Sequence, residues 1–412
     1  MSPHALSESE WAELKARWFV LFDLPEEERL RSLDDPTITE RVRAELVRML
    51  QAEALPSTAL DHAAHVHLGL ATPSSGDATT AGIAPTDRWV GRRVGPFEVR
   101  RLIARGGMGA VYEAERADAA YHQRVAIKTV WRGAESDVLL QRFRSERQIL
   151  AALQHPNISQ LVDGGTAADG TPWLAMEYVA GEPSDVWCDR RRLGLAARLD
   201  LFRQVCAAVH HAHQRLVVHR DLKPGNVFVN AEGTVKLLDF GIAKLMEPIP
   251  TAGDSTLTEA GLSPLTAAYA APEQVKGESI STATDVFALG ALLCTLLAGA
   301  PPHDLVGLDN VTRLVRVRDD APRLPSTVAA AQTHDAAHVR GFASATRLAD
   351  ALRGELDAIA SMALRRDPAK RYPSAEALSD DIHRYLRRDR VLARPDTTAY
   401  RLWTFIRRHR GL

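Results

Sequence analysis

The spacing of hydrophobic residues changes along the chain, and these changes predict where its helices, strands and linker lie. Near the N-terminus, Ser7 and Glu10 have capping-box spacing, and apolar residues then recur on one helical face, a signal repeated from Thr37. Residues 7 to about 55 are therefore predicted to form a helical hairpin. Between Leu70 and Arg88 no apolar period is found, and small, polar and turn-forming residues dominate, as is typical of a linker.

The remainder predicts a small β-rich lobe followed by a larger helical one, an α+β class. From Val90 to about Val130, short β-branched runs alternate with glycine and polar turns, which indicates antiparallel strands. After about Asp185 the pattern is mainly helical. The apolar stretch 286–300 is shorter than the roughly 20 residues needed to cross a bilayer, so it predicts a buried helix.

Composition narrows the class of protein. With 45% hydrophobic and 25% charged residues among 412, the chain resembles an ordinary globular protein. A formal net charge of -1 provides no basic field, so no nucleic-acid partner is expected. Three widely spaced cysteines without a CxxC motif, and no basic start followed by an apolar run, favour a cytoplasmic protein without disulfides or zinc.

Two segments of the β-rich lobe carry candidate phosphate chemistry. Residues 103–112 predict a strand, a glycine-rich bend and a second strand, and glycines let backbone N–H groups approach phosphate oxygens closely. Lys128 lies in the apolar strand 125–128, where an ammonium needs an anion. Glu146, eighteen residues later in a predicted helix, can supply one, although a surface ion pair is the simpler alternative.

Three later motifs favour the phosphate-binding interpretation of Lys128 and Glu146 over a surface ion pair. Residues 219–226 read His-Arg-Asp-Leu-Lys-Pro-Gly-Asn and fit H-R-D-L-x-x-x-N at every fixed position. Asp-Phe-Gly follows at 239–241, and Ala-Pro-Glu at 271–273. This order of motifs resembles the eukaryotic-like protein kinases, and specifically bacterial serine/threonine kinases, from about Val90 to Arg388. The bacterial resemblance is strengthened by the strings at 155–158, 176–179 and 366–372.

The resemblance implies a bilobal protein-kinase fold. The expected parts are a helical N-terminal extension (1–70), a flexible linker (71–88), a kinase domain (89–390) and a basic amphipathic tail (391–412). The kinase domain would divide into an antiparallel β-rich N-lobe with one main helix, about 89–179, and a larger helical C-lobe, about 180–390.

The resemblance also assigns chemical roles for transfer of phosphate from ATP to protein Ser or Thr hydroxyls. Lys128, fixed by Glu146, would hold the α- and β-phosphates. Asp221 would orient the hydroxyl and accept its proton, and Lys223 would neutralise the moving phosphoryl group. Asn226 and Asp239 would hold Mg²⁺, or Mn²⁺ in its place. The implied nucleotide-binding residues are Ala104, Arg105, Gly106, Gly107, Met108, Gly109, Val111, Ala126, Lys128, Met176, Glu177, Val179 and Phe228. Of these, the resemblance implies that Val111, Ala126, Met176 and Phe228 surround adenine and that the backbone at Glu177 and Val179 hydrogen-bonds to it.

Further residues are expected to regulate or support the site. In related kinases, the arginine at the Arg220 position pairs with a phosphorylated activation segment. Asp285 is expected to anchor the catalytic loop, and Arg371 to pair with Glu273. Thr266 is expected to line the peptide site. The activation segment lies between the Asp-Phe-Gly and Ala-Pro-Glu motifs. Its candidate phosphate acceptors, which could equally be solubilising loop residues, are Ser255, Thr256, Thr258 and Ser263.

Some features depart from the pattern or allow another interpretation. Ala104 replaces the first loop glycine and Ala267 replaces a proline, so a pseudokinase scaffold is the main rival, with a small-molecule phosphotransferase as the second. His210, His211 and His213 suggest a metal site, although helix packing is the favoured interpretation.

The expected partners are ATP, protein substrates and a second kinase copy for trans-autophosphorylation. The tail could also rest on an anionic membrane surface or dock on the kinase lobe. Its basic and apolar residues are Arg401, Leu402, Trp403, Phe405, Ile406, Arg407, Arg408 and Arg410.

Overall fold

The computed structural model describes residues 33, 35, 38–43, 46–47, 88–106, 109–118, 122–130, 147, 150–240 and 267–394. The chain divides into two compact units, residues 1–73 and 74–412. In the first unit, residues 40–43 and 46–47 are helical, and Ile38, Val42 and Leu46 are buried. Most of the predicted helical hairpin lies outside the described residues.

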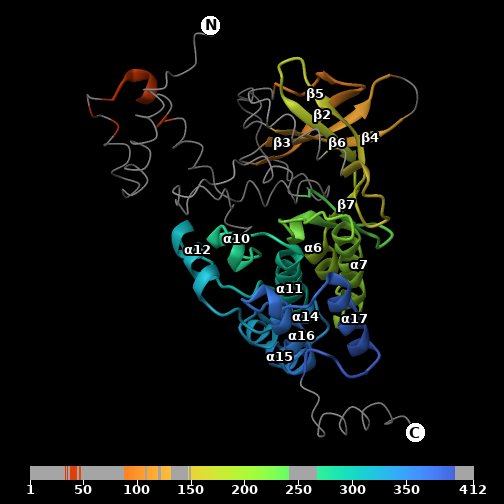
Figure 1. Ribbon diagram of the computed structural model, residues 1–412, viewed down its shortest axis with the longest axis vertical. Helices are drawn as coiled ribbons and strands as arrows, with labels where there is room; N and C mark the ends of the chain where they lie inside the picture. Colours follow the sequence, from red (N-terminus) through yellow and green to blue (C-terminus); the bar gives the residue numbers. More distant parts are fainter. Residues whose placement is uncertain are drawn as a thin grey trace, which may run out of the picture. The chain divides into compact units, whose positions relative to one another are not determined.

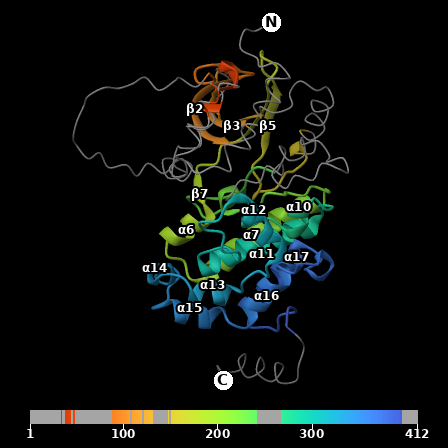
Figure 2. The same ribbon diagram turned by 90° about the vertical axis from the view of Figure 1, so that its left-hand side faces the viewer.

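The second unit contains a six-stranded antiparallel sheet, seen with the helices in Figures 1 and 2. Its strands follow the order β1-β2-β3-β4-β6-β5. The bounds are β1 (Arg93–Val94), β2 (Phe97–Gly106), β3 (Gly109–Arg116), β4 (Arg124–Val130), β5 (Leu161–Thr166) and β6 (Pro172–Glu177). Because side chains alternate between the faces of a strand, Phe97, Tyr112 and Ile127 come together with Trp173 in one apolar cluster. The predicted antiparallel lobe is confirmed.

A three-stranded sheet leads from the first sheet into the helical lobe. It is formed by β7 (Gly181–Pro183), β8 (Val227–Asn230) and β9 (Val235–Leu237). Gly181 is required where β7 crosses β8, because a Cβ there would lie 2.6 Å from the carbonyl oxygen of Val229. Ile158 forms a parallel bridge with Leu237 and so joins β9 to the segment before β5.

The larger lobe is helical, as predicted, and surrounds one buried helix (Figure 2). The α-helices are α6 (Ser184–Arg190), α7 (Leu195–His213), α10 (Pro272–Lys276), α11 (Thr282–Ala298), α12 (Asn310–Asp319), α13 (Pro325–Ala330), α14 (His334–His338), α15 (Ala345–Leu352), α16 (Glu355–Ala363) and α17 (Ala375–Leu386). In the part of the chain that the structure describes, η1 (Pro224–Asn226) and η2 (Pro368–Lys370) are short 3-10 helices.

Helix α11 is the buried helix that the apolar stretch predicts. It begins after Ser281, whose hydroxyl accepts a hydrogen bond from the backbone N–H of Ala283. Every residue from Thr284 to Ala298 is buried. Gly299 ends the helix with φ +95°, a backbone conformation that favours glycine. Among the residues that the structure describes, no helix is both long and apolar enough to cross a membrane.

Packing continues beyond α17 into the first residues of the predicted tail (391–412). Val391 is only 2% exposed and belongs to the core. The buried carboxylate of Asp381 accepts hydrogen bonds from the backbone N–H groups of Leu392 (2.6 Å) and Ala393 (2.9 Å). These contacts fix the segment up to Ala393, and residues 395–412 lie outside the described part. The predicted N-lobe helix is described only in part, with Arg147 and Leu150 helical.

Candidate active site

Strand register places the candidate nucleotide-binding residues of the first sheet on one face. Val111 pairs with both Ala104 and Lys128, and Lys128 pairs in turn with Leu174. Directly paired residues share a face of a sheet, so these four side chains form one cross-strand row. Ala126 pairs with Met176 in the next row on the same face. This is the face opposite the apolar cluster that contains Tyr112 and Ile127.

The predicted glycine-rich turn joins β2 and β3. Gly106 pairs with Gly109 at its base, and Gly107 and Met108 lie outside the described residues. Arg105 is exposed and Ala104 is half-buried. Register shifts occur in β2 between Val99 and Arg101 and between Leu102 and Ala104, so this strand twists on its way to the turn.

The remaining candidate adenine-contacting residues lie where β6 ends and on β8. Met176 is buried at 9% exposure, whereas Glu177 and Val179 are half-buried. The carbonyl oxygen of Glu177 accepts a hydrogen bond from the Ser159 hydroxyl at 3.2 Å. Phe228 is half-buried on β8, opposite Pro183 of β7. These positions lie at the junction between the two sheets.

Lys128 does have the anionic partner that its position in an apolar strand requires. Its Nζ lies 3.0 Å from Oδ1 of Asp239, with the two side chains 20% and 36% exposed. The contact joins the six-stranded sheet to the segment that follows β9. Asp239 has φ +47°, a left-handed conformation that is costly for a residue other than glycine and is frequent at functional sites. Glu146 lies outside the described residues.

The catalytic-loop residues hold one another in a compact network. Oδ2 of Asp221 accepts hydrogen bonds from the side-chain amide of Asn226 at 2.9 Å and lies 3.0 Å from Nζ of Lys223. The same amide of Asn226 donates to the Asp221 carbonyl oxygen at 2.7 Å. Asn226 is 8% exposed, so this network fixes the carboxylate of Asp221 from the inner side of the loop.

Asp285, at the start of the buried helix, anchors this loop as predicted. Its carboxylate accepts hydrogen bonds from the backbone N–H groups of His219 (2.7 Å) and Arg220 (2.9 Å). It also contacts Nε2 of His213 at 2.8 Å, which places His213 in helix packing rather than in a metal site. Arg220 has φ +66°, and these bonds help to hold that strained conformation.

His219 joins the loop to the Asp-Phe-Gly segment. The imidazole is fully buried, its Nε2 lies 2.8 Å from the carbonyl oxygen of Leu238, and its Nδ1 accepts from the N–H of Asp221 at 3.3 Å. Burial lowers the pKa of His219, so the neutral ring is favoured, and one donor and one acceptor fit its two nitrogens. The ring packs on Phe240 with centroids 4.7 Å apart.

The predicted pair between Glu273 and Arg371 is also present. The guanidinium contacts both carboxylate oxygens, at 2.6 and 2.8 Å, and both side chains are buried. Burial raises the pKa of Glu273, but the Arg371 hydrogen bonds and charge outweigh it, so the net pKa is below its ordinary value. The neighbouring Gln274 donates to the Arg220 carbonyl oxygen at 3.0 Å and thereby ties α10 to the catalytic loop.

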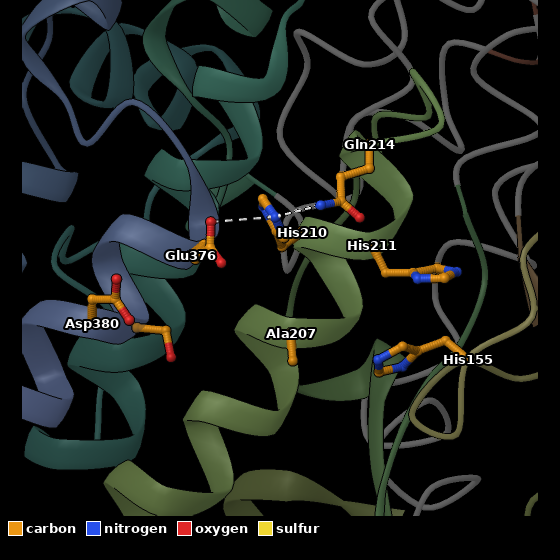
Figure 3. A pocket seen from close by; sticks show the side chains of 8 residues that line it. His155, Ala207, His210, His211, Gln214, Glu376 and Asp380 are labelled. Atoms are coloured by element: carbon orange, nitrogen blue, oxygen red, sulfur yellow. Dashed lines mark hydrogen bonds and ion pairs between the residues drawn. The ribbon is translucent and has the colours of Figure 1, made fainter.

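The other two members of the histidine group, His210 and His211, lie in the same last turn of α7 as His213. His155, His210 and His211 line a cavity of about 360 Å³ together with Glu376 and Asp380 of α17 (Figure 3). Among the described residues, no group of three or more His, Cys, Asp or Glu side chains is placed to hold a metal ion. Nδ1 of His155 accepts from the N–H of Asn157 at 3.1 Å, so the neutral ring carries its proton on Nε2, which cannot then bind a metal.

The donor set of the catalytic loop fits a hard cation. Both hydrogens of the Asn226 amide nitrogen are directed to Asp221, so the remaining polar atom of that side chain is the oxygen Oδ1. Asp239 adds a partly exposed carboxylate. Carboxylate and amide oxygens are the ligands that Mg²⁺ and Mn²⁺ take from proteins.

Comparison with known proteins agrees with this architecture. The protein kinase domain model matches residues 97–382. The serine/threonine-protein kinase PknA of Mycobacterium tuberculosis is 38% identical over 237 residues, which cover 56% of this chain and 53% of PknA. The probable serine/threonine-protein kinase SCO3848 of Streptomyces coelicolor is 36% identical over 296 residues, 70% of this chain and 39% of that protein.

Among solved structures, the kinase domain of PknI from Mycobacterium tuberculosis matches with a TM-score of 0.50 and 27% identity, over 71% of this chain and 97% of that one. The family match covers more than half of the chain, so the chain belongs to the protein kinase family and has its bilobal fold. It spans about half the length of PknA.

Several supporting residues were missed by sequence reasoning. His219 lies within a recognised motif, so the motif itself could have drawn attention to its side chain. Gln274, Lys236 and Asn157 make side-chain bonds between elements that are distant in sequence. No periodicity or motif spacing in the sequence signals those contacts.

Proposed function

We propose that the chain is an ATP- and Mg²⁺-dependent serine/threonine protein kinase that transfers the γ-phosphate of ATP to protein hydroxyls. The observation that carries the proposal is the 3.0 Å contact between Lys128 and Asp239. It brings a cation of the β-rich lobe and a carboxylate of the helical lobe to one place, next to the network around Asp221. Phosphoryl transfer is catalysed mainly by positioning and charge neutralisation, and this arrangement supplies both.

In the proposed reaction, Asp221 orients the substrate hydroxyl and accepts its proton as the new O–P bond forms. The bond between the γ-phosphorus and the bridging oxygen breaks, and ADP leaves. Lys223, already 3.0 Å from Asp221, neutralises charge on the phosphoryl group, and Lys128 holds the α- and β-phosphates. Asn226 and Asp239 would hold Mg²⁺, or Mn²⁺, which supplies further positive charge against the phosphates.

A direct test is phosphate incorporation from labelled ATP into the chain and into generic protein substrates. Lys128→Met and Asp221→Asn should each reduce transfer at least about a hundredfold. The matched controls are Lys276→Met and Asp200→Asn, which change exposed residues in weak surface ion pairs. Wild-type protein that binds ATP but transfers no phosphate would support the pseudokinase interpretation and overturn the proposal.

Autophosphorylation is a finer part of the proposal. Ser255, Thr256, Thr258 and Ser263 lie in residues 241–266, outside the described part, and Arg220 is the proposed partner of a phosphate there. Mass-spectrometric mapping should find phosphate on at least one of the four in wild type. Mixing active protein with the Asp221→Asn chain should label the inactive chain if transfer occurs between two copies. Phosphate confined to other regions would contradict this part.

Location and membrane contact complete the proposal. We place the protein in the cytoplasm, because it would use ATP and its three buried cysteines are free thiols. Contact of the basic tail with anionic membrane can be tested by co-sedimentation with phosphatidylserine vesicles. A chain that ends at Arg394 keeps the packed Val391 and loses residues 395–412, which include the basic and apolar residues of the tail. Equal sedimentation of the two chains would exclude membrane contact by the tail.

A further inference from the structure

One ion pair joins the two sheets of the kinase domain. Nζ of Lys236, on β9, lies 2.8 Å from Oε1 of Glu177 and donates to Oε2 at 2.9 Å. Glu177 is the last residue of β6. The side chains are 17% and 35% exposed, so solvent screens the pair only in part. The pair therefore connects the end of the six-stranded sheet with the strand that leads to Asp239.

The backbone of residues 157–160 also connects β6 with β9. Toward β9, the N–H of Leu237 donates to the Asn157 carbonyl at 2.8 Å, and the N–H of Ser159 donates to the Leu237 carbonyl at 3.0 Å. Toward β6, the N–H of Glu177 donates to the Gln160 carbonyl at 2.8 Å. The N–H of Gln160 donates to Oε2 of Glu177 at 3.3 Å. The same four-residue segment is thus bonded to both strands.

Two side-chain amides fix that segment against helix α7. The Asn157 amide donates to the carbonyl of Val235 at 2.9 Å and to Oε1 of Gln204 at 3.2 Å. Oε1 of Gln204 also accepts from the N–H of Val235 at 3.2 Å. These bonds hold β9 to the helical lobe, so the backbone that carries Lys236 is fixed where the ammonium contacts Glu177.

We propose that Lys236 and Glu177 are positioning residues that set the distance between the two ends of a bound nucleotide. Glu177 begins the backbone segment that is predicted to meet adenine, and Asp239 lies three residues after Lys236. Loss of the pair removes the direct side-chain contact between β6 and β9 and leaves the two strands joined through residues 157–160, so the adenine and phosphate contacts are less well matched. The inference rests on the proposed ATP binding, and it makes nucleotide affinity, rather than the chemical step, the property that the pair controls.

The test is the dissociation constant of a non-hydrolysable ATP analogue with Mg²⁺, measured by calorimetry on the full chain. Lys236→Met and Glu177→Gln should each weaken binding about threefold to fivefold, the upper range for a partly exposed pair. Lys236→Arg keeps the charge and should remain within about twofold of wild type. KM for ATP should rise in parallel while kcat stays within about twofold.

The matched control is Asp118→Asn. It breaks the Arg116–Asp118 pair, which has a similar length (2.9 Å) and similar exposure (21% and 31%) but lies within one lobe. Its nucleotide affinity should equal that of wild type. Amide hydrogen exchange at residues 177–179 and 237 should accelerate in Lys236→Met and not in the control.

An affinity of Lys236→Met within about 1.5-fold of wild type, or a fall in kcat at unchanged affinity, would overturn the positioning role. The affinity measurement needs no catalysis. Wild-type protein that binds the analogue but transfers no phosphate would therefore refute the proposed function, while the comparison of dissociation constants would still decide the role of Lys236.

Discussion

Replacing Arg371 by leucine should strongly destabilise the kinase domain, because the guanidinium of Arg371 is completely buried and all of its donors are hydrogen-bonded. Nη1 and Nη2 contact the two carboxylate oxygens of Glu273 at 2.6 and 2.8 Å. The guanidinium also donates to the backbone carbonyls of Arg365 (2.7 Å), Ala283 (2.8 Å) and Arg366 (3.1 Å). The substitution removes all five hydrogen bonds at once.

The loss of stability in Arg371→Leu comes mainly from the buried carboxylate of Glu273, which is left without its cation. Glu273 is 3% exposed, and without Arg371 its carboxylate keeps the hydroxyl of Thr284 at 2.9 Å as a hydrogen-bond donor. Removing one member of a buried ion pair typically costs about 3–5 kcal/mol. For a domain of this size that corresponds to a fall in Tm of about 5–10 °C. The double variant Glu273→Leu/Arg371→Leu leaves no buried charge, so it should be less destabilised than Arg371→Leu alone.

Thermal unfolding followed by circular dichroism measures this effect. The matched control is Arg353→Leu, which removes an ion pair of similar length, 2.9 Å to Asp350, between side chains 68% and 54% exposed. Because exposed pairs contribute little, its Tm should remain within about 2 °C of wild type. A Tm for Arg371→Leu that is no lower than that of this control would show that breaking the buried pair with Glu273 costs no more than breaking an exposed pair, and would refute the prediction.

Two other residues give independent predictions. Burial lowers the pKa of His303 to about 4, so the folded state keeps it neutral while the unfolded state protonates below about pH 6.5. Stability should fall from pH 6.5 toward 4, by roughly 1.4 kcal/mol at pH 5.5, and His303→Phe should reduce that loss in pH-dependent unfolding. Asp381→Asn replaces one of the two accepting carboxylate oxygens by an NH2 donor, so the N–H group of Leu392 or of Ala393 loses its acceptor and exchange of at least one of these amides should accelerate.

Sequence patterns predicted the parts of this fold that depend on local period and on motif order. The apolar run after Asp285 predicted α11, although the helix begins earlier, at Thr282, because Ser281 supplies the cap. The contacts of Asp285 with the catalytic loop and of Arg371 with Glu273 followed from the family resemblance and are confirmed. Both contacts connect recognised motifs, and this is why they could be predicted.

Other contacts could not be predicted from the sequence, for a physical reason. Lys236 and Glu177 are 59 positions apart, and their meeting depends on how residues 157–160 lie between β6 and β9. Val391 looked like the start of a tail, yet the buried Asp381 bonds the residues that follow it. Such contacts arise from tertiary packing of particular side chains, which neither hydrophobic period nor motif spacing encodes.

The most direct test of the central claim compares phosphoryl transfer with nucleotide binding in wild type and Asp221→Asn. Asp221 lies in the network with Lys223 and Asn226, and its proposed role is in the chemical step. Asp221→Asn should bind an ATP analogue about as tightly as wild type and incorporate labelled phosphate into Ser or Thr at least about a hundredfold more slowly. Equal incorporation by the two proteins would contradict the role of Asp221 in the chemical step, and no incorporation by wild type would contradict the proposed kinase activity.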